Sequence, residues 1–152
     1  MDTWGVDFGL LSCNREVLSN PYSYRDPHTN DSLKEITEVI PRDVLFSRTG
    51  VTPAAINTIC QLHAIKKHNQ NLMEKAKTLL LTPNLLSHLF SGVKANEYTI
   101  STTTSLFNIH ERNWDNALMT KLSLPTEMMA HIVMPREQLS DRRFLPFITN
   151  LA

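Results

Sequence analysis

Apolar and polar residues alternate at the start of the chain. The apolar members of this alternation are Trp4, Val6, Phe8 and Leu10. A period of two is typical of a β-strand. The predicted opening is a small hairpin or sheet edge. It continues with a turn over residues 13–16, a short return strand at Val17-Leu18 and a brief strand over Tyr22–Asp26.

From about residue 31 the apolar spacing becomes helical. Helices are expected at four places that carry cap or stop signals, namely Asp31 or Ser32 to Ile40, Pro41 to Gly50, Thr52-Pro53 to about Lys67, and Thr82-Pro83 to Gly92. Two short helices are expected over 114–122 and 126–132. Lys77–Leu81 fits either a strand or a helix end, and the Ser/Thr-rich Glu97–Leu106 is typical of extended chain or a loop. A sheet edge followed by several helices predicts an α/β or α+β fold.

Composition limits the class of protein. The chain has 152 residues, 41% hydrophobic, with 15 basic and 15 acidic side chains, which suits one modest domain. The absence of a basic cluster argues against a nucleic-acid binder or a polybasic membrane-surface protein. There is no apolar run of about 20 residues and no leader-like start, so a cytoplasmic protein is expected. Cys13 and Cys60 form no zinc pattern and are most simply two reduced thiols, with a disulfide left open.

The usual catalytic motifs are missing. Only four glycines occur, so no glycine-rich phosphate loop exists in this sequence. His63 and His68 are five residues apart and do not share a helix face, which predicts no metal site.

Three short segments are candidate ligand contacts. Gly5 beside Trp4 allows close approach of a ligand to the backbone, Tyr24-Arg25-Asp26 offers donors, acceptors and a flat ring to a polyol, and Thr99–Ser105 is rich in hydroxyls. From the pattern alone a structural role is favoured for each: a packed strand, a local ion pair and a solvated strand.

Several segments, in order, resemble the rhamnulokinase branch of the FGGY carbohydrate kinases over about Asp2–Pro135. The segments are Asp2–Phe8, Tyr24–Thr29, Arg48-Thr49-Gly50, Asn57-Thr58 with Gln61-Leu62, Leu79–Leu81 with Pro83, Leu89 with Gly92-Val93-Lys94, Asn96–Thr99, Thr103-Thr104 and Trp114-Asp115. The resemblance implies an α/β fold that is part of an actin-like ATPase (ribonuclease H-like) domain. It also implies a cytoplasmic transferase of rhamnose catabolism that passes phosphate from MgATP to L-rhamnulose, giving L-rhamnulose 1-phosphate.

The resemblance also assigns residues. Gly5 matches a glycine that contacts the sugar through its backbone, Trp4 sits beside it, and Tyr24 and Arg25 match a strand end that faces the sugar cleft. The family's phosphate hairpin, catalytic aspartate and C-terminal domain have no counterpart here, so no catalytic or metal-binding residue is assigned, and neither ATP nor Mg is expected to bind well. The sequence departs from the family at Ile100, where Asn is usual, at His28, where Arg is usual, and at Ser12 and Arg15, where Asp and Gly are usual.

After Pro135 the likeness stops. Codons can be chosen for Arg136–Asp141 so that the neighbouring frame reads Pro-Gly-Thr-Val-Ile-Gly, the family's continuation, which predicts a frameshift near Pro135. Residues 1–135 are therefore expected to be a fragment of the kinase N-terminal domain, 136–152 a divergent, out-of-frame tail, and Met1 an internal start.

Two functions follow as hypotheses. The first is a truncated sugar kinase domain, inactive alone, whose cut sheet makes it marginally stable and prone to self-association through exposed edges. The alternative is a non-catalytic remnant that binds a sugar or a complementing kinase fragment.

Overall fold

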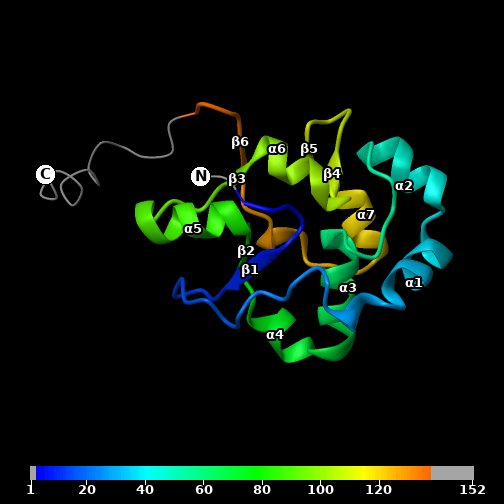
Figure 1. Ribbon diagram of the computed structural model, residues 1–152, viewed down its shortest axis with the longest axis horizontal. Helices are drawn as coiled ribbons and strands as arrows, with labels where there is room; N and C mark the ends of the chain where they lie inside the picture. The colour runs from blue at the N-terminus through cyan, green and yellow to red at the C-terminus, as the bar shows by residue number, and fades with distance from the viewer. Residues whose placement is uncertain (1–2, 138–152) are drawn as a thin grey trace, which may run out of the picture.

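The computed structural model describes residues 3–137, and the tail predicted to be out of frame lies outside the described residues from 138 onward. Seven α-helices and six short strands occur along this part of the chain (Figure 1). The strands are β1 (Phe8–Leu11), β2 (Thr78–Leu81), β3 (Asn96–Glu97), β4 (Phe107–Asn108), β5 (Asn113–Trp114) and β6 (Ile132–Val133). The helices are α1 (Ser32–Val39), α2 (Arg42–Thr49), α3 (Thr58–His68), α4 (Gln70–Lys75), α5 (Thr82–Ser91), α6 (Tyr98–Ser101) and α7 (Asn116–Lys121). The expected α/β class is confirmed.

The described strands pair two by two. β1 runs antiparallel to β2 with Phe8 opposite Leu81 and Leu11 opposite Thr78. β3 and β6 are parallel, β4 and β5 are antiparallel, and a single parallel bridge joins Leu79 to Met129.

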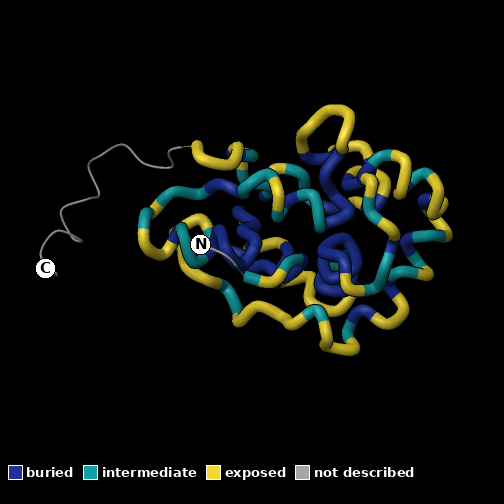
Figure 2. The backbone as a smooth tube through the Cα atoms, turned by 45° about the horizontal axis from the view of Figure 1, so that its top comes forward, coloured by how far each residue is buried: buried dark blue, intermediate teal, exposed yellow. Residues whose placement is uncertain are grey.

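β1 and β2 form the centre of the molecule. All eight of their residues are buried, and Leu79, Leu80 and Leu81 have no exposed surface. Apolar side chains from α1, α3 and α7 join the same core cluster, including Ile36, Leu62 and Leu118. In Figure 2 this buried backbone fills the middle of the molecule, with the exposed segments around it.

Several predicted elements are confirmed. α1 and α2 lie where the apolar spacing placed them, and α2 ends at Gly50 with φ 70°. α5 begins with the Thr82-Pro83 pair and ends at Gly92 with φ 73°. A left-handed residue after a helix favours glycine because it carries no Cβ. The predicted hairpin return is reduced to one bridge between Leu11 and Val17.

The strand predicted over Tyr22–Asp26 is wrong. This segment is a turn that leads into a 3₁₀ helix, Pro27–Thr29, and the Asp26 carboxylate accepts from the His28 N–H at 3.0 Å. The extended or loop conformation expected over Glu97–Leu106 is also wrong. The Glu97 carboxylate caps α6 by accepting from the N–H groups of Thr99 and Ile100, and a 3₁₀ turn over Thr102–Thr104 follows.

Three helix boundaries also differ from the prediction. α3 begins at Thr58 and not at Thr52-Pro53, because the Asn57 side chain accepts from the Ala54 N–H at 2.8 Å and holds the preceding loop. α7 begins at Asn116, since Trp114 pairs in β5. The segment 126–132 holds only a 3₁₀ turn, Thr126–Met128, before β6.

Both cysteines are free thiols. Cys13 is exposed and Cys60 is buried, and burial raises the pKa of the Cys60 thiol to about 12. Cys60 is therefore an unreactive core residue.

Candidate functional site

The backbone turns sharply just before β1. The Asp7 N–H donates to the Gly5 carbonyl at 2.9 Å, and Val6 between them has φ 67°. A β-branched residue rarely adopts this left-handed conformation, and such strain is found mostly at ligand sites. Residues 4–7, here called the Trp4–Asp7 turn, are therefore the starting point for a candidate site.

Two helices hold this turn in place. The Val6 carbonyl accepts from Thr58 Oγ1 at 2.6 Å and from Gln61 Nε2 at 3.2 Å, both on α3. The Asp7 carbonyl accepts from the N–H and the hydroxyl of Thr82, the first residue of α5, each at 3.0 Å. Four hydrogen bonds thus compensate the strain at Val6 and fix the turn relative to the core.

The carboxylate of Asp7 orients the indole of Trp4. Asp7 is 3% exposed, and its Oδ2 accepts from Trp4 Nε1 at 2.7 Å while its Oδ1 accepts from Gln61 Nε2 at 3.2 Å. The indole itself is 58% exposed. A flat aromatic surface is therefore held in a fixed orientation and left open to solvent.

Gly5 lies against Thr103. A Cβ at Gly5 would be 3.2 Å from Thr103 Oγ1, closer than an ordinary contact. The absence of a Cβ at Gly5 therefore lets the turn pack closely against the Thr103 side chain. Trp4 and Gly5, two of the four residues predicted to contact a sugar, are consecutive in the sequence and both lie in this turn.

Tyr24 and Arg25 lie in an exposed turn and not at a strand end. Arg25 Nε donates to Tyr24 Oη at 3.0 Å, and the guanidinium carbon lies 5.4 Å from the centre of the tyrosine ring. Within residues 3–137 no hydrogen bond joins this pair to the Trp4–Asp7 turn. Their part in a common site stays a prediction.

Sequence reasoning missed the residues that hold the turn. Thr58 and Gln61 belong to a segment that carries the family resemblance, but a resemblance does not say that they bind a carbonyl across the core. Thr82 was interpreted only as a helix start. The left-handed Val6 leaves no signal in the residue pattern, because valine is the residue least expected there.

Metal-ligating side chains do not cluster within the described residues. No group of three or more His, Cys, Asp or Glu side chains able to hold a metal ion occurs among residues 3–137. The Asp7 carboxylate is already engaged by Trp4 and Gln61.

None of the helices described is both long enough and apolar enough to cross a bilayer.

Comparison with known proteins gives the class of the fold. A gluconate kinase and a xylulose kinase, both from Lactobacillus acidophilus, each superpose with a TM-score of 0.82 and 16% identity, over 90% of this chain and 28% of theirs. The fold is therefore that of the sugar kinases with an actin-like ATPase architecture.

The sequence comparisons give the family. The profile of the "FGGY family of carbohydrate kinases, N-terminal domain" matches residues 3–142, and the chain belongs to this family. A rhamnulokinase from Halalkalibacterium halodurans is 39% identical over 91% of this chain and 30% of its own length. One from Oceanobacillus iheyensis is 38% identical over 94% of this chain, again with 30% of its own length. The chain therefore spans about three tenths of the length of these relatives, and its predicted resemblance to the rhamnulokinase branch is confirmed.

Proposed function

We propose that this chain is the sugar-contacting part of a rhamnulokinase-like kinase, and that it binds L-rhamnulose without phosphorylating it when it acts alone. The observation that carries the proposal is the Trp4–Asp7 turn, which four hydrogen bonds from α3 and α5 hold in a strained conformation. A strained backbone is expected to persist, in place of a relaxed one, where a ligand needs the strained geometry. The rhamnulokinase relatives support the choice of sugar.

In this proposal the described residues only bind and orient the sugar. The indole of Trp4 offers a flat apolar face to the C–H side of a sugar ring, and the partly exposed backbone at Gly5 offers polar groups to a hydroxyl. ATP and a divalent metal belong to the reaction of the complete family, and we expect neither to bind well to this chain. The chain is expected to work in the cytoplasm and to have no turnover by itself.

Isothermal titration with L-rhamnulose, paired with an assay for ADP release, tests the proposal. Binding without turnover is the expected result. Gly5→Ala is expected to weaken sugar binding about tenfold or more, since its Cβ pushes on Thr103 and covers the backbone. Asn71→Ala is the control, because Asn71 is an exposed position on α4 and is expected to bind the sugar like the wild type. Equal affinity of Gly5→Ala and the wild type would contradict the site.

The second candidate, a remnant that binds a complementing kinase fragment, rests on the chain's three-tenths share of its relatives' length. Turnover that appears only after addition of the remaining part of a relative would favour it.

We propose further that residues 1–135 form the kinase portion and that the reading frame changes near Pro135. Sequencing the DNA around codon 135 tests this. A frame that reads Pro-Gly-Thr-Val-Ile-Gly after a one-base correction supports the proposal, and codons that cannot be read in that way contradict it.

A further inference from the structure

The second half of α5 presents apolar side chains to solvent. Leu86, Leu89 and Phe90 follow the i, i+3, i+4 spacing and therefore share one side of the helix. Leu89 is 63% exposed, Phe90 is 78% exposed and Leu86 is half-buried. None of the three belongs to a core cluster within residues 3–137. We call these three side chains the α5 face.

Such a face is unusual on the outside of a helix. The inner side of α5 is buried through Leu85 and His88, and the helix contains no Asp, Glu, Lys or Arg. A surface helix normally carries charged and polar residues opposite its buried side. Adjacent exposed apolar side chains in that place indicate an interaction surface.

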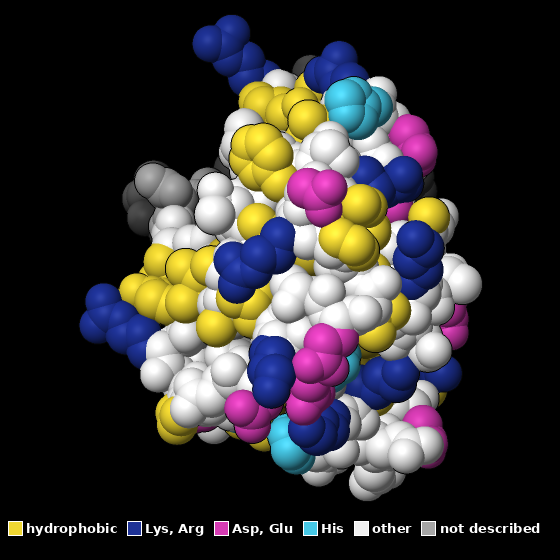
Figure 3. All heavy atoms as spheres, turned by 90° about the vertical axis from the view of Figure 1, so that its right-hand side faces the viewer, with side chains coloured by type: hydrophobic (Ala, Val, Ile, Leu, Met, Phe, Trp, Pro, Cys, Tyr) yellow, Lys and Arg dark blue, Asp and Glu magenta, His cyan; other side chains and the backbone are white. Residues whose placement is uncertain are grey.

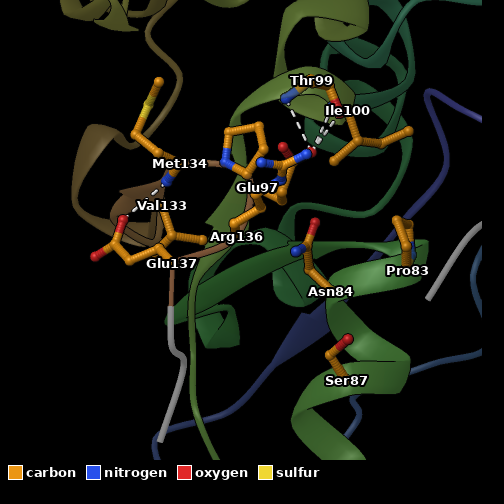
Figure 4. A pocket seen from close by; sticks show the side chains of 11 residues that line it. Pro83, Asn84, Ser87, Glu97, Thr99, Ile100, Val133, Met134, Arg136 and Glu137 are labelled. Atoms are coloured by element: carbon orange, nitrogen blue, oxygen red, sulfur yellow. Dashed lines mark hydrogen bonds between the residues drawn. The ribbon is translucent and has the colours of Figure 1, made fainter.

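The chain that follows β6 passes beside α5. Ser87 of α5 lines a pocket of about 490 Å³ together with Met134 and Glu137, and Figure 4 shows Ser87 on one side of this pocket and Glu137 on the other. The chain turns at this point, because the Glu137 N–H donates to the Met134 carbonyl at 3.0 Å and the Glu137 carboxylate accepts from the Met134 N–H at 2.9 Å. Residues 138–152 therefore continue from a point close to the α5 face.

This remaining sequence contains an apolar segment. Residues 144–148 read Phe-Leu-Pro-Phe-Ile, five apolar residues in a row. The seven residues from Glu137 to Phe144 can span about 23 Å. The α5 face is about 6 Å long along the helix axis, and Ser87 within that length lines the same pocket as Glu137. The apolar segment is therefore long enough, and attached closely enough, to reach the whole face.

We propose that residues 144–148 bind the α5 face of the same chain, with the rings of Phe144 and Phe147 against Leu89 and Phe90. Aromatic side chains bury a large apolar area for few rotatable bonds, which suits such a contact. The short connection keeps the effective concentration of the segment in the millimolar range, so a second copy of the chain competes for the face only at high protein concentration. This proposal goes beyond the sugar contact at the Trp4–Asp7 turn and does not depend on it.

Paramagnetic broadening in NMR spectra of the isotopically labelled full chain tests the proposal. A nitroxide is attached to the thiol of Asn150→Cys in a Cys13→Ser background, in which the other thiol is the buried Cys60. The backbone N–H signals of the α5 face are expected to broaden. The matched control carries the nitroxide at Ser47→Cys, an exposed position on α2 across the molecule from α5 (Figure 1), and should leave these signals sharp.

Substitutions on both sides locate the contact. Phe144→Ser combined with Phe147→Ser is expected to lower the ratio of bound to free segment about tenfold, because the burial of two rings is lost. Phe90→Ser removes the most exposed ring of the α5 face and should reduce the broadening too. Phe46→Ser replaces a phenylalanine of α2 that is 53% exposed, and this control should leave the broadening unchanged.

Three results would overturn the proposal. The first is a sharp set of α5-face signals in the chain labelled at Asn150→Cys, and the second is broadening that persists when Phe144 and Phe147 are both replaced. The third comes from a mixture in which one chain carries the nitroxide and another carries the isotopes, so that only contacts between copies are seen. Broadening in this mixture as strong as within one chain would assign the α5 face to a second copy.

Discussion

Left-handed backbone at residues with a side chain is a recurrent feature of this molecule. Within residues 3–137 it occurs at Val6, Arg15, Ser105, Arg112, Ser123 and Arg136. Val6 is compensated by hydrogen bonds to its carbonyl from two side chains of α3. Arg15 is not compensated in this way: it lies exposed in the turn after β1, with φ 68°.

Replacing Arg15 by glycine is expected to stabilise the chain. The left-handed conformation destabilises a residue that has a Cβ by about 1–2 kcal/mol. A glycine avoids this strain, but its greater flexibility in the unfolded chain offsets part of the gain in stability. Arg15→Gly should raise the free energy of unfolding by roughly 0.5–1 kcal/mol in urea titrations. Glu16→Gly, one residue further on without a left-handed backbone, should lower it. A lower unfolding free energy for Arg15→Gly would show that the strain is not significant.

At the scale of elements, one ion pair joins α2 to the start of α7. The guanidinium of Arg48 donates to both carboxylate oxygens of Asp115, at 2.6 and 2.9 Å. The Asp115 carboxylate also accepts from Asn108 Nδ2 at 3.0 Å and from the Leu118 N–H at 3.0 Å, and its side chain has no exposed surface. Although burial alone raises the pKa of Asp115, these hydrogen bonds, led by that of Arg48, hold it below its ordinary value of 3.8.

Asp115→Asn is expected to lower the free energy of unfolding by about 2–3 kcal/mol at neutral pH, because the amide cannot accept two bonds from Arg48. A depressed pKa in the folded state stabilises at pH values above the unfolded pKa, near 4, and this contribution is lost as the pH falls through the folded pKa. The wild type should therefore lose its advantage over Asp115→Asn below about pH 4. Glu111→Gln is the control, since Glu111 is exposed and its contact with Arg48 is 4.0 Å. A difference between wild type and Asp115→Asn that does not change from pH 6 to pH 3 would refute this account.

A second pH dependence of stability is expected from the contact between α1 and α3. Burial lowers the pKa of His63 below 6.5, although Glu35 opposes this shift with its carboxylate 3.6 Å from His63 Nδ1. The folded state therefore prefers neutral His63, so its contribution is present above pH 6.5 and is lost as the pH falls through the folded pKa. Thermal unfolding between pH 7.5 and 5.5 should show the wild type losing stability relative to His63→Gln. His68 is exposed, so the stability of the wild type relative to His68→Gln should not change over this pH range.

The elements that could be located from the sequence are those whose ends are marked by a single residue. Gly50 and Gly92 end helices because each takes a left-handed conformation, a requirement visible in a single residue. The helix after Glu97 escaped prediction because Thr99 and Ile100 are β-branched residues that favour strands, while the deciding interaction is a carboxylate cap. The start of α3 was misplaced because Asn57 fixes the loop through its side chain. The side chains that hold the Trp4–Asp7 turn could not be predicted, since the bonds from α3 and α5 to this turn join positions more than 50 residues apart.

At the scale of the whole molecule, the surface combines charge with exposed apolar side chains. Figure 3 shows Lys, Arg, Asp and Glu interspersed with apolar groups over one face. Elsewhere, Leu89 and Phe90 near the end of α5 are 63% and 78% exposed. The described sheets have only two strands each, and the β1–β2 pair is extended only by single bridges, from Leu11 to Val17 and from Leu79 to Met129.

Self-association at high concentration is the expected consequence. Sedimentation should give a weight-average mass that rises with protein concentration. Phe90→Glu should reduce this rise, because it adds a charge to the apolar end of α5. Ser47→Glu is the control, because it adds the same charge at an exposed polar position. Leu33→Glu would not serve, since Leu33 packs against the core. A mass that does not depend on concentration would exclude association.

The two tryptophans stand in opposite environments, and this gives the chain two separate optical reporters. Trp4 is 58% exposed and bonded to Asp7, while Trp114 is 6% exposed and donates to the Ala130 carbonyl at 2.7 Å. Emission from Trp4 should be red-shifted and accessible to a soluble quencher, and that from Trp114 blue-shifted and protected. Replacing Trp114 by phenylalanine would leave Trp4 to report occupancy of the candidate site, and replacing Trp4 would leave Trp114 to report unfolding of the interior.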